Sequence, residues 1–100
     1  MNPDKYIKNY INGALSPATS GAYLDTINPA IAKTYAYFPD SGEEDVQKAI
    51  GAAQKAFPNW QRLDPEKRFR LLMRMADIIE QERDVFARAE ARDSGKPLSM

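Results

Sequence analysis

The side chains that most often perform catalysis are missing from this sequence of 100 residues. It contains no cysteine and no histidine, so it has no thiolate nucleophile, no imidazole base, no disulfide framework and no zinc site of the usual ligands. The acidic run Glu43-Glu44-Asp45 could suggest a divalent-metal site. These residues begin a predicted helix, where negative charge complements the helix dipole, and we interpret them in that way.

Two further patterns suggest phosphate or nucleic-acid binding, and both fit structural roles better. A phosphate loop needs a glycine five positions before Gly95 and a serine or threonine after Lys96, but Glu90 and Pro97 occupy those positions. Acidic residues interrupt the basic stretch over residues 62–74, as on a solvated helix face. The 14 basic and 14 acidic residues cancel, which disfavours a dedicated binder of nucleic acids or membrane surfaces.

The residue chemistry changes near residue 40, from β-branched, aromatic and turn-forming residues to helix formers. Strands are predicted within residues 6–38, over 6–11, 14–15, 22–27 and 34–38. Asn12-Gly13 favours positive φ and predicts a two-residue hairpin turn after the first strand. The tyrosines at strand spacing are interpreted as cross-strand packing residues rather than base-stacking platforms; they are Tyr6, Tyr10, Tyr35 and Tyr37.

Three helices follow in the prediction, over residues 43–57, 65–81 and 84–93. The first is expected to begin with a capping box, in which Ser41 and Glu44 satisfy free backbone donors. Pro58 is expected to end it, because proline lacks the backbone N–H that a continuing helix needs. Asp64 and Pro65 are typical of the N-cap and the first position of the second helix.

The second predicted helix carries apolar residues on more than one side; they are Phe69, Leu71, Leu72, Met73, Met75, Ala76, Ile78 and Ile79. At about 100° per residue they cover over half of the circumference, so this helix needs several packing partners. A 100-residue domain with short strands offers few of them. Gly95 is expected to end the third helix in a left-handed conformation, and another helix could begin at Leu98-Ser99-Met100. We therefore expect the beginning of a larger protein.

Several short motifs occur along the chain in a fixed order. They are Tyr10-Ile11-Asn12-Gly13, Ile27-Asn28-Pro29-Ala30, Glu44-Asp45-Val46 with Ala49, Ala52-Ala53, Ala56-Phe57 and Trp60, then Arg68, Leu71-Leu72, Ala76-Asp77-Ile78-Ile79-Glu80 and Asp93-Ser94-Gly95-Lys96-Pro97. Together, from Tyr6 to Met100, they closely resemble the amino-terminal segment of NAD(P)-dependent aldehyde dehydrogenases. The sequence looks most similar to the branch with betaine-aldehyde, aminoaldehyde and muconic-semialdehyde dehydrogenases.

The resemblance implies an α/β fold that is aldehyde-dehydrogenase-like. Residues 1–100 would form an incomplete amino-terminal part of the Rossmann-like cofactor-binding domain. The family enzyme oxidises an aldehyde to a carboxylic acid with NAD or NADP through a cysteine thiohemiacetal. None of its catalytic or cofactor-binding residues maps onto this chain, so the isolated 100 residues should be inactive. The resemblance also implies a homodimer or homotetramer of the full-length protein.

One functional element of the family could lie within this segment. Several members hold a monovalent cation, Na⁺ or K⁺, through main-chain oxygens and one carboxylate, and the matching positions are Thr26, Ile27 and Asp93. Asp93 also falls near the carboxyl end of a predicted helix, where the dipole disfavours an acid by about 0.3–1 kcal/mol and a cation would relieve the cost. The alternative is that Arg92 or Lys96 neutralises Asp93, or that Asp93 caps a loop.

A second hypothesis is a stand-alone, non-enzymatic α+β module for interaction or oligomerisation. In that case the helix over residues 65–81 would be buried in a homodimer or partner interface. No stretch approaches the roughly 18 apolar residues of a membrane-spanning helix, and Met1–Lys5 lacks the apolar core of a signal peptide. Under either hypothesis we expect a soluble, cytoplasmic protein that binds neither nucleic acid nor membrane.

Overall fold

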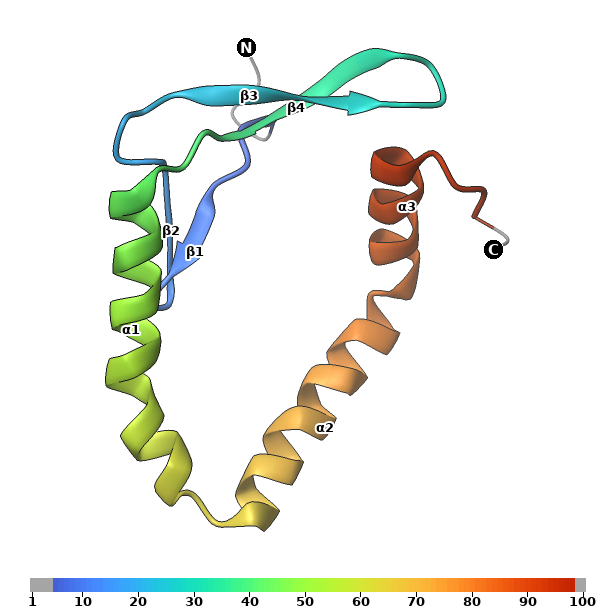
Figure 1. Ribbon diagram of the computed structural model, residues 1–100. Helices are drawn as coiled ribbons and strands as arrows, with labels where there is room; N and C mark the ends of the chain where they lie inside the picture. The colour runs from blue at the N-terminus through green and yellow to red at the C-terminus, as the bar shows by residue number, and fades with distance from the viewer. Residues whose placement is uncertain (1–4, 99–100) are drawn as a thin grey trace.

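A computed structural model describes residues 5–98, and it confirms an α/β architecture with strands before helices (Figure 1). The elements are β1 (Asn9–Ile11), β2 (Ala14–Ser16), β3 (Tyr23–Asn28), β4 (Lys33–Pro39), α1 (Glu43–Arg62), α2 (Pro65–Gln81) and α3 (Arg83–Ser94). Two expectations fall partly outside the described residues: the opening Met1–Lys5, and a further helix from Leu98 to Met100.

The four strands form two separate antiparallel hairpins, β1–β2 and β3–β4. Asn12 and Gly13 take φ values of 54° and 78°, which confirms the turn expected between the first two strands. The first strand is shorter than predicted, because it begins at Asn9 instead of Tyr6. Tyr6 leaves that hairpin and makes a parallel bridge to Tyr37 of β4, so its backbone belongs with the second hairpin.

Aromatic rings reinforce this bridge. The Tyr6 ring lies 4.9 Å from the Tyr23 ring in an edge-on arrangement and 5.2 Å from the Tyr37 ring in a stacked one, measured between centroids. Such pairs contribute beyond the area they bury. Cross-strand packing is therefore correct for Tyr6 and Tyr37, whereas Tyr10 is 73% exposed.

The β3–β4 ladder contains one irregularity. Thr26 pairs with Ala36, and the next residue, Ile27, pairs with Thr34. Tyr35 is therefore an extra residue in β4 without a place in the ladder, which is the geometry of a β-bulge. A bulge turns the local side chain away from the alternation of a regular strand, and the periodicity of the sequence does not reveal it.

The start of α1 differs from the predicted capping box. The N-cap is Gly42 rather than Ser41, and Ser41 Oγ instead accepts a hydrogen bond of 2.8 Å from the Asn9 side chain. The carboxylate that reaches back is that of Asp45, which accepts the Gly42 N–H at 3.0 Å. Glu44 lies one position too early for this role and only approaches Lys48 at 3.8 Å.

Asp45 also connects α1 to the loop before β3. Its carboxylate accepts the Thr19 N–H at 2.9 Å and the Thr19 hydroxyl at 2.7 Å. It is the one charged residue among those described that is buried, at 6% exposure. The hydrogen bonds from Thr19 and from the Gly42 backbone lower the pKa of Asp45, because each favours the ionised form.

The prediction that Pro58 ends the first helix is wrong, because α1 continues to Arg62. Proline removes the single backbone bond to the carbonyl four residues earlier, and residues on either side can keep theirs. The helix ends instead before Pro65, which excludes its predecessor Asp64 from the helical region; Asp64 has φ −57° and ψ 141°. Trp60 consequently lies in the last turn of α1 and not beyond it.

The other helices follow the predictions closely. The bounds of α2 agree with those expected, and α3 is one residue longer at each end. Gly95 has φ 77° and donates its N–H to Ala91 O at 2.8 Å, which confirms the left-handed cap. Asp64 is the N-cap of α2, although its side chain accepts no capping hydrogen bond.

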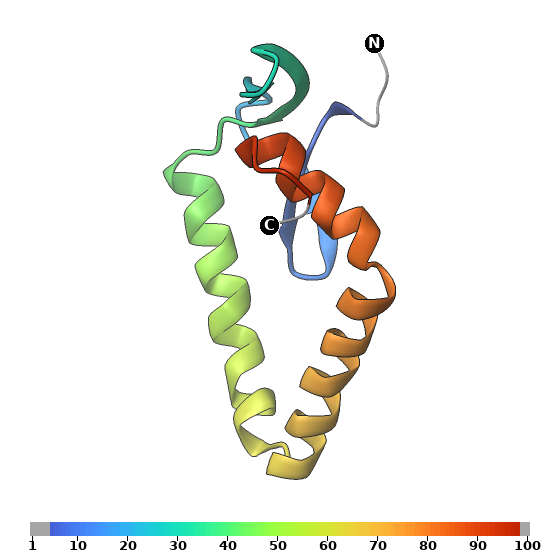
Figure 2. The ribbon, with the colours of Figure 1, turned by 90° about the vertical axis from the view of Figure 1, so that its right-hand side faces the viewer.

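The described residues do not enclose a core. The two buried apolar residues among them are Ala18 and Ala36, and α2 contains no buried residue. Figures 1 and 2 show why, since α1 and α2 diverge from their junction like the arms of a V. The radius of gyration is 16.9 Å, against about 13 Å for a compact chain of this length.

The accessible surface gives the same result. It amounts to 8290 Å² for a mass of 11.3 kDa, whereas a folded monomer of that mass exposes about 5,700 Å². The excess of about 2,600 Å² has the size of an obligate interface. None of the described helices is long and apolar enough to cross a membrane.

We predict that Asp45→Asn will loosen the start of α1 and the loop at Thr19, because a neutral amide accepts hydrogen bonds more weakly than a carboxylate. The test uses the whole natural translation product that contains these residues, called the complete protein below. Hydrogen–deuterium exchange should accelerate roughly tenfold in peptides that cover residues 17–22 and 40–46.

The matched control is Glu44→Gln, which removes one negative charge from the same helical turn without breaking these bonds. Because the folded pKa of Asp45 is lowered, its contribution is complete above the ordinary Asp pKa and is lost as the pH falls through the folded value. Acidification should therefore loosen the wild type more than Asp45→Asn. Equal exchange in the two variants at neutral pH would contradict the assigned role.

Candidate functional site

The two segments singled out from the sequence as a cation site lie close together in the fold. The carboxyl end of α3, which carries Asp93, packs against β3, which carries Thr26 and Ile27 (Figures 1 and 2). Beyond the helix, Gly95 fits against Pro29: a Cβ atom on this glycine would lie 2.9 Å from Pro29 Cγ. The tertiary structure thus brings the ends of β3 and α3 into direct contact.

Thr26 carries an unusual feature for a strand residue. Its hydroxyl oxygen is buried and has no hydrogen-bond partner among the described residues. A buried polar atom without a partner costs about 1–3 kcal/mol, so such atoms commonly have a ligand, water or ion beside them. Ile27 is 52% exposed and lies next to the bulge that interrupts the β3–β4 ladder.

Asp93 has a partner that lies far from it in the sequence. The Tyr35 hydroxyl donates a hydrogen bond of 2.9 Å to Asp93 Oδ1. Neither Arg92 nor Lys96 forms an ion pair with Asp93 in the part of the chain that the structure describes. The neutralisation offered as an alternative explanation is therefore not observed, and a tyrosine occupies one carboxylate oxygen instead.

Arg92, which precedes Asp93 in the sequence, contacts the ring of the same tyrosine. The Arg92 guanidinium carbon lies 4.5 Å from the centroid of the Tyr35 ring, within the range of a cation–π interaction. Arg92 and Asp93 thus occupy two different parts of one aromatic side chain, the face of its ring and its hydroxyl. We call Tyr35, Arg92 and Asp93 the tyrosine latch.

Partial burial raises the pKa of Tyr35, and the hydrogen bond and negative charge of Asp93 raise it further, while the charge of Arg92 acts in the opposite direction. All three raising effects disfavour the phenolate. Tyr35 therefore remains a protonated donor throughout the neutral range, as its bond to Asp93 requires.

The contacts of the tyrosine latch cannot be predicted from the sequence, for a physical reason. Tyr35 is the bulged residue of β4, whereas regular strand spacing had assigned it, like the other tyrosines, to cross-strand packing. Its partners lie 57 and 58 positions further along the chain. A spacing of that length between an aromatic and an acidic residue carries no signal in a single sequence.

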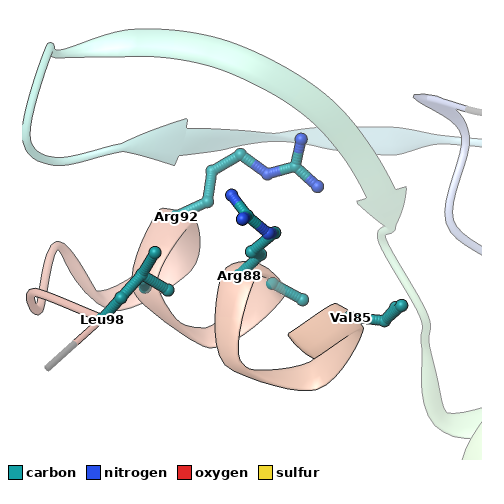
Figure 3. Close-up of a pocket in the computed structure, with 6 residues that line it drawn as sticks. Val85, Arg88, Arg92 and Leu98 are labelled. Carbon is teal, nitrogen blue, oxygen red and sulfur yellow. The ribbon is translucent and has the colours of Figure 1, made fainter. Parts of the chain in front are cut away.

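An open depression of about 480 Å³ lies beside the latch, along the same face of α3. Val85, Arg88, Arg92 and Leu98 line it, and Figure 3 shows both arginine side chains extending from the helix towards the β3–β4 hairpin. Its walls combine guanidinium groups with aliphatic side chains. This surface can bind by charge and by apolar contact, but its lining residues include no nucleophile.

The donor set at the β3–α3 junction suits a weakly bound, hard cation better than a transition metal. Within residues 5–98 no three acidic, histidine or cysteine side chains gather around one point. The junction offers one carboxylate oxygen not engaged by Tyr35, a buried hydroxyl and the nearby main chain of β3. Oxygen donors with a single negative charge are chemically compatible with Na⁺ or K⁺.

Comparison with protein families gives one match over most of the chain. Residues 16–100 match the family described as the aldehyde dehydrogenase family. A 2-aminomuconic semialdehyde dehydrogenase of Homo sapiens is 37% identical over 94 residues, which are 94% of this chain and 19% of that protein. Aldehyde dehydrogenase 1 of Tanacetum cinerariifolium is 40% identical over 98 residues, or 96% of this chain and 20% of that protein.

Solved structures show the same likeness. The aldehyde dehydrogenase of Bacillus cereus in its NAD⁺ complex is 34% identical, with a TM-score of 0.91 over 99% of this chain and 22% of that one. A betaine aldehyde dehydrogenase of Staphylococcus aureus, also with NAD⁺, is 31% identical, with a TM-score of 0.87 over 92% of this chain and 19% of its own. The chain thus spans about a fifth of the length of the proteins it matches.

We predict that Gly95→Ala will separate the end of α3 from β3. The substitution places a side chain at a φ of 77° and sets its Cβ 2.9 Å from Pro29 Cγ, so the complete protein should lose more than the roughly 1–2 kcal/mol that a left-handed conformation costs an L-residue. Urea denaturation of the complete protein measures the loss.

Gly21→Ala is the matched control, because Gly21 has a φ of 74° but a Cβ added to it would meet no atom within 4 Å. It isolates the cost of the backbone conformation from that of the contact with Pro29. Pro29→Ala should restore part of the stability in the Gly95→Ala background. If Gly95→Ala and Gly21→Ala lose equal free energy of unfolding, and Pro29→Ala restores none of it, the contact between Gly95 and Pro29 does not contribute to stability.

Proposed function

Because this chain belongs to the aldehyde dehydrogenase family, we propose that it is an amino-terminal segment of an enzyme that oxidises an aldehyde to a carboxylic acid with NAD or NADP. The family match over residues 16–100 carries this proposal. The likeness to two enzymes whose structures contain NAD⁺ supports the nicotinamide cofactor. The relatives include a 2-aminomuconic semialdehyde and a betaine aldehyde dehydrogenase, which fits the branch that the sequence resembles.

The chemistry itself must come from residues outside these hundred. The proposed reaction runs through a cysteine thiohemiacetal, and this chain contains no cysteine. A cysteine outside these residues would add to the aldehyde carbon, and the oxidised nicotinamide, when bound, would supply the hydride acceptor. The described residues do not bring together the nucleophile, the base and the oxyanion donors that this reaction needs.

The segment would instead be part of the frame of the cofactor-binding domain. Its excess exposed area of about 2,600 Å² and the uncovered sides of α2 need a covering surface. Phe69, Leu72 and Met75 of α2 are each more than half exposed. Burial of such side chains contributes about 25 cal/mol per Å², so docking onto the rest of a Rossmann-like domain would supply the core that residues 5–98 lack.

At the β3–α3 junction, we propose a monovalent cation held by main-chain oxygens of Thr26 and Ile27 and by the Asp93 carboxylate. The unpartnered Thr26 hydroxyl supports a ligand at this place, and so does the carboxylate oxygen that Tyr35 leaves unbonded. A cation there would also relieve the cost of an acid at a helix carboxyl end. K⁺ and Na⁺ are the ions in question.

The remaining proposals concern the setting of the complete protein. A homodimer or homotetramer fits the amount of apolar surface, part of which could face a second copy. A cytoplasmic location fits a composition without cysteine and with balanced charge.

The enzymatic proposal is tested with the complete protein. The measurement is the rise in near-ultraviolet absorbance as NADH or NADPH forms in the presence of an aldehyde. We predict activity with small aldehydes and its loss on alkylation with iodoacetamide, whereas residues 1–100 alone should show neither activity nor a reaction with iodoacetamide at cysteine. A complete protein that reduces no nicotinamide cofactor with any aldehyde would overturn the proposal.

The same preparation of residues 1–100 separates a segment from a stand-alone module. A segment should melt without a cooperative transition and bind the dye anilinonaphthalene sulfonate, because its apolar faces are uncovered. A cooperative melt together with a discrete dimer in sedimentation would favour the non-enzymatic α+β module.

For the cation, we predict that K⁺ or Na⁺ raises the melting temperature of the complete protein above its value in N-methylglucamine chloride of equal ionic strength. Asp93→Ala should remove this rise, because it deletes the one carboxylate of the site. Asp84→Ala, in the first turn of the same helix and exposed, is the control and should keep it. Identical dependence on the salt in wild type and Asp93→Ala would end the assignment.

A further inference from the structure

Tyr35 is the common point between two neighbouring residues of opposite charge. Its ring lies under the Arg92 guanidinium at 4.5 Å, and its hydroxyl donates to Asp93 Oδ1 at 2.9 Å. Arg92 and Asp93 both contact Tyr35, and an arginine forms charge-assisted bonds with a carboxylate within its reach. Instead Arg92 stacks on the ring, and within residues 5–98 it forms no ion pair with Asp93.

The backbone prepares Tyr35 for this position. As the extra residue of the β4 bulge, Tyr35 has no place in the ladder, whereas its neighbours Thr34 and Ala36 are paired with Ile27 and Thr26. Bulges re-aim a side chain and often lie beside functional sites. The bulge in β4 therefore lies opposite the two β3 residues proposed as main-chain ligands, and the Tyr35 side chain reaches α3.

The separation of Arg92 from Asp93 matters for the proposed site, because the Arg92 guanidinium and a bound cation would compete for the Asp93 carboxylate. An arginine forms strong, charge-assisted bonds with a carboxylate, and a K⁺ ion would have to displace them. Holding the guanidinium on an aromatic face removes the competitor, and bonding one carboxylate oxygen fixes the direction of the other.

We propose that Tyr35 is a positioning residue, which keeps Arg92 away from Asp93 and orients the Asp93 carboxylate so that it stays available to an external monovalent cation. This inference rests on the proposed cation site and adds to it a residue that does not touch the ion. It assigns separate tasks to two parts of one side chain: the hydroxyl orients Asp93, and the ring retains Arg92.

The experiment measures the potassium response of the complete protein, defined as its melting temperature in KCl minus that in N-methylglucamine chloride at equal ionic strength. Tyr35→Phe keeps the ring and loses the hydroxyl, so its response should be smaller than that of the wild type. Tyr35→Leu also releases Arg92, and its response should vanish. Tyr35→Leu with Arg92→Gln removes the released competitor, and its response should return to the level of Tyr35→Phe.

The double variant distinguishes positioning from a structural role, because a second substitution in a damaged site does not restore ion binding unless the arginine was the cause. A wild-type response in Tyr35→Leu, or no recovery in the double variant, would overturn the inference. Arg92→Gln alone, which leaves the tyrosine intact, should respond at least as strongly as the wild type. A weaker response would overturn the inference even if Tyr35→Leu does not fold.

The failures of the linked proposals are distinguishable. If the wild type shows no potassium response, both the cation site and the role of Tyr35 fall, while the aldehyde assay remains an independent test of the enzyme. If the wild type responds, Asp93→Ala does not, and Tyr35→Leu still does, then the site stands and only the role of Tyr35 is wrong.

Discussion

The chain cannot cover its own apolar surface, and most of its structure follows from that constraint. Side chains such as Phe69, Leu72 and Met75 lie on α2 with more than half of their surface exposed. The hydrophobic effect, normally the largest stabilising contribution to a fold, therefore acts only weakly among residues 5–98. These elements keep a shape that matches about a fifth of each of two larger enzymes, at TM-scores of 0.91 and 0.87 over almost all of this chain.

Because few apolar side chains are buried between the elements, specific hydrogen bonds do much of the work of joining them. Asp45 connects the start of α1 to the loop at Thr19, Ser41 accepts from Asn9 of β1, and Tyr35 connects β4 to α3 through Asp93. Each bond links residues at least 26 positions apart. Hydrogen bonds are directional, so a few of them can fix how elements meet even where little surface is buried.

The positions of these polar contacts also indicate where a segment without catalytic groups can carry a functional residue. Each of these polar contacts involves a residue at, or just before, the end of a helix, where backbone groups lack helical partners. At the end of α3 the same groups that hold the helix to the sheet leave one carboxylate oxygen unbonded by Tyr35, beside β3 with its buried, unpartnered hydroxyl. In our proposal, the contact that joins α3 to the sheet and the cation site therefore share the residue Asp93.

The sequence by itself determined the local structure: the Asn12-Gly13 turn, the bounds of α2 and the left-handed Gly95 depend on residues near one another in the chain. The family resemblance placed Thr26, Ile27 and Asp93 at one site, and in the structure α3 packs against β3. Only the tertiary structure decided that Asp45 rather than Glu44 caps α1, that α1 passes through Pro58, and that a bulge directs Tyr35 to Asp93. These outcomes depend on competition between partners that are distant in sequence, and local propensity holds no information about which partner wins.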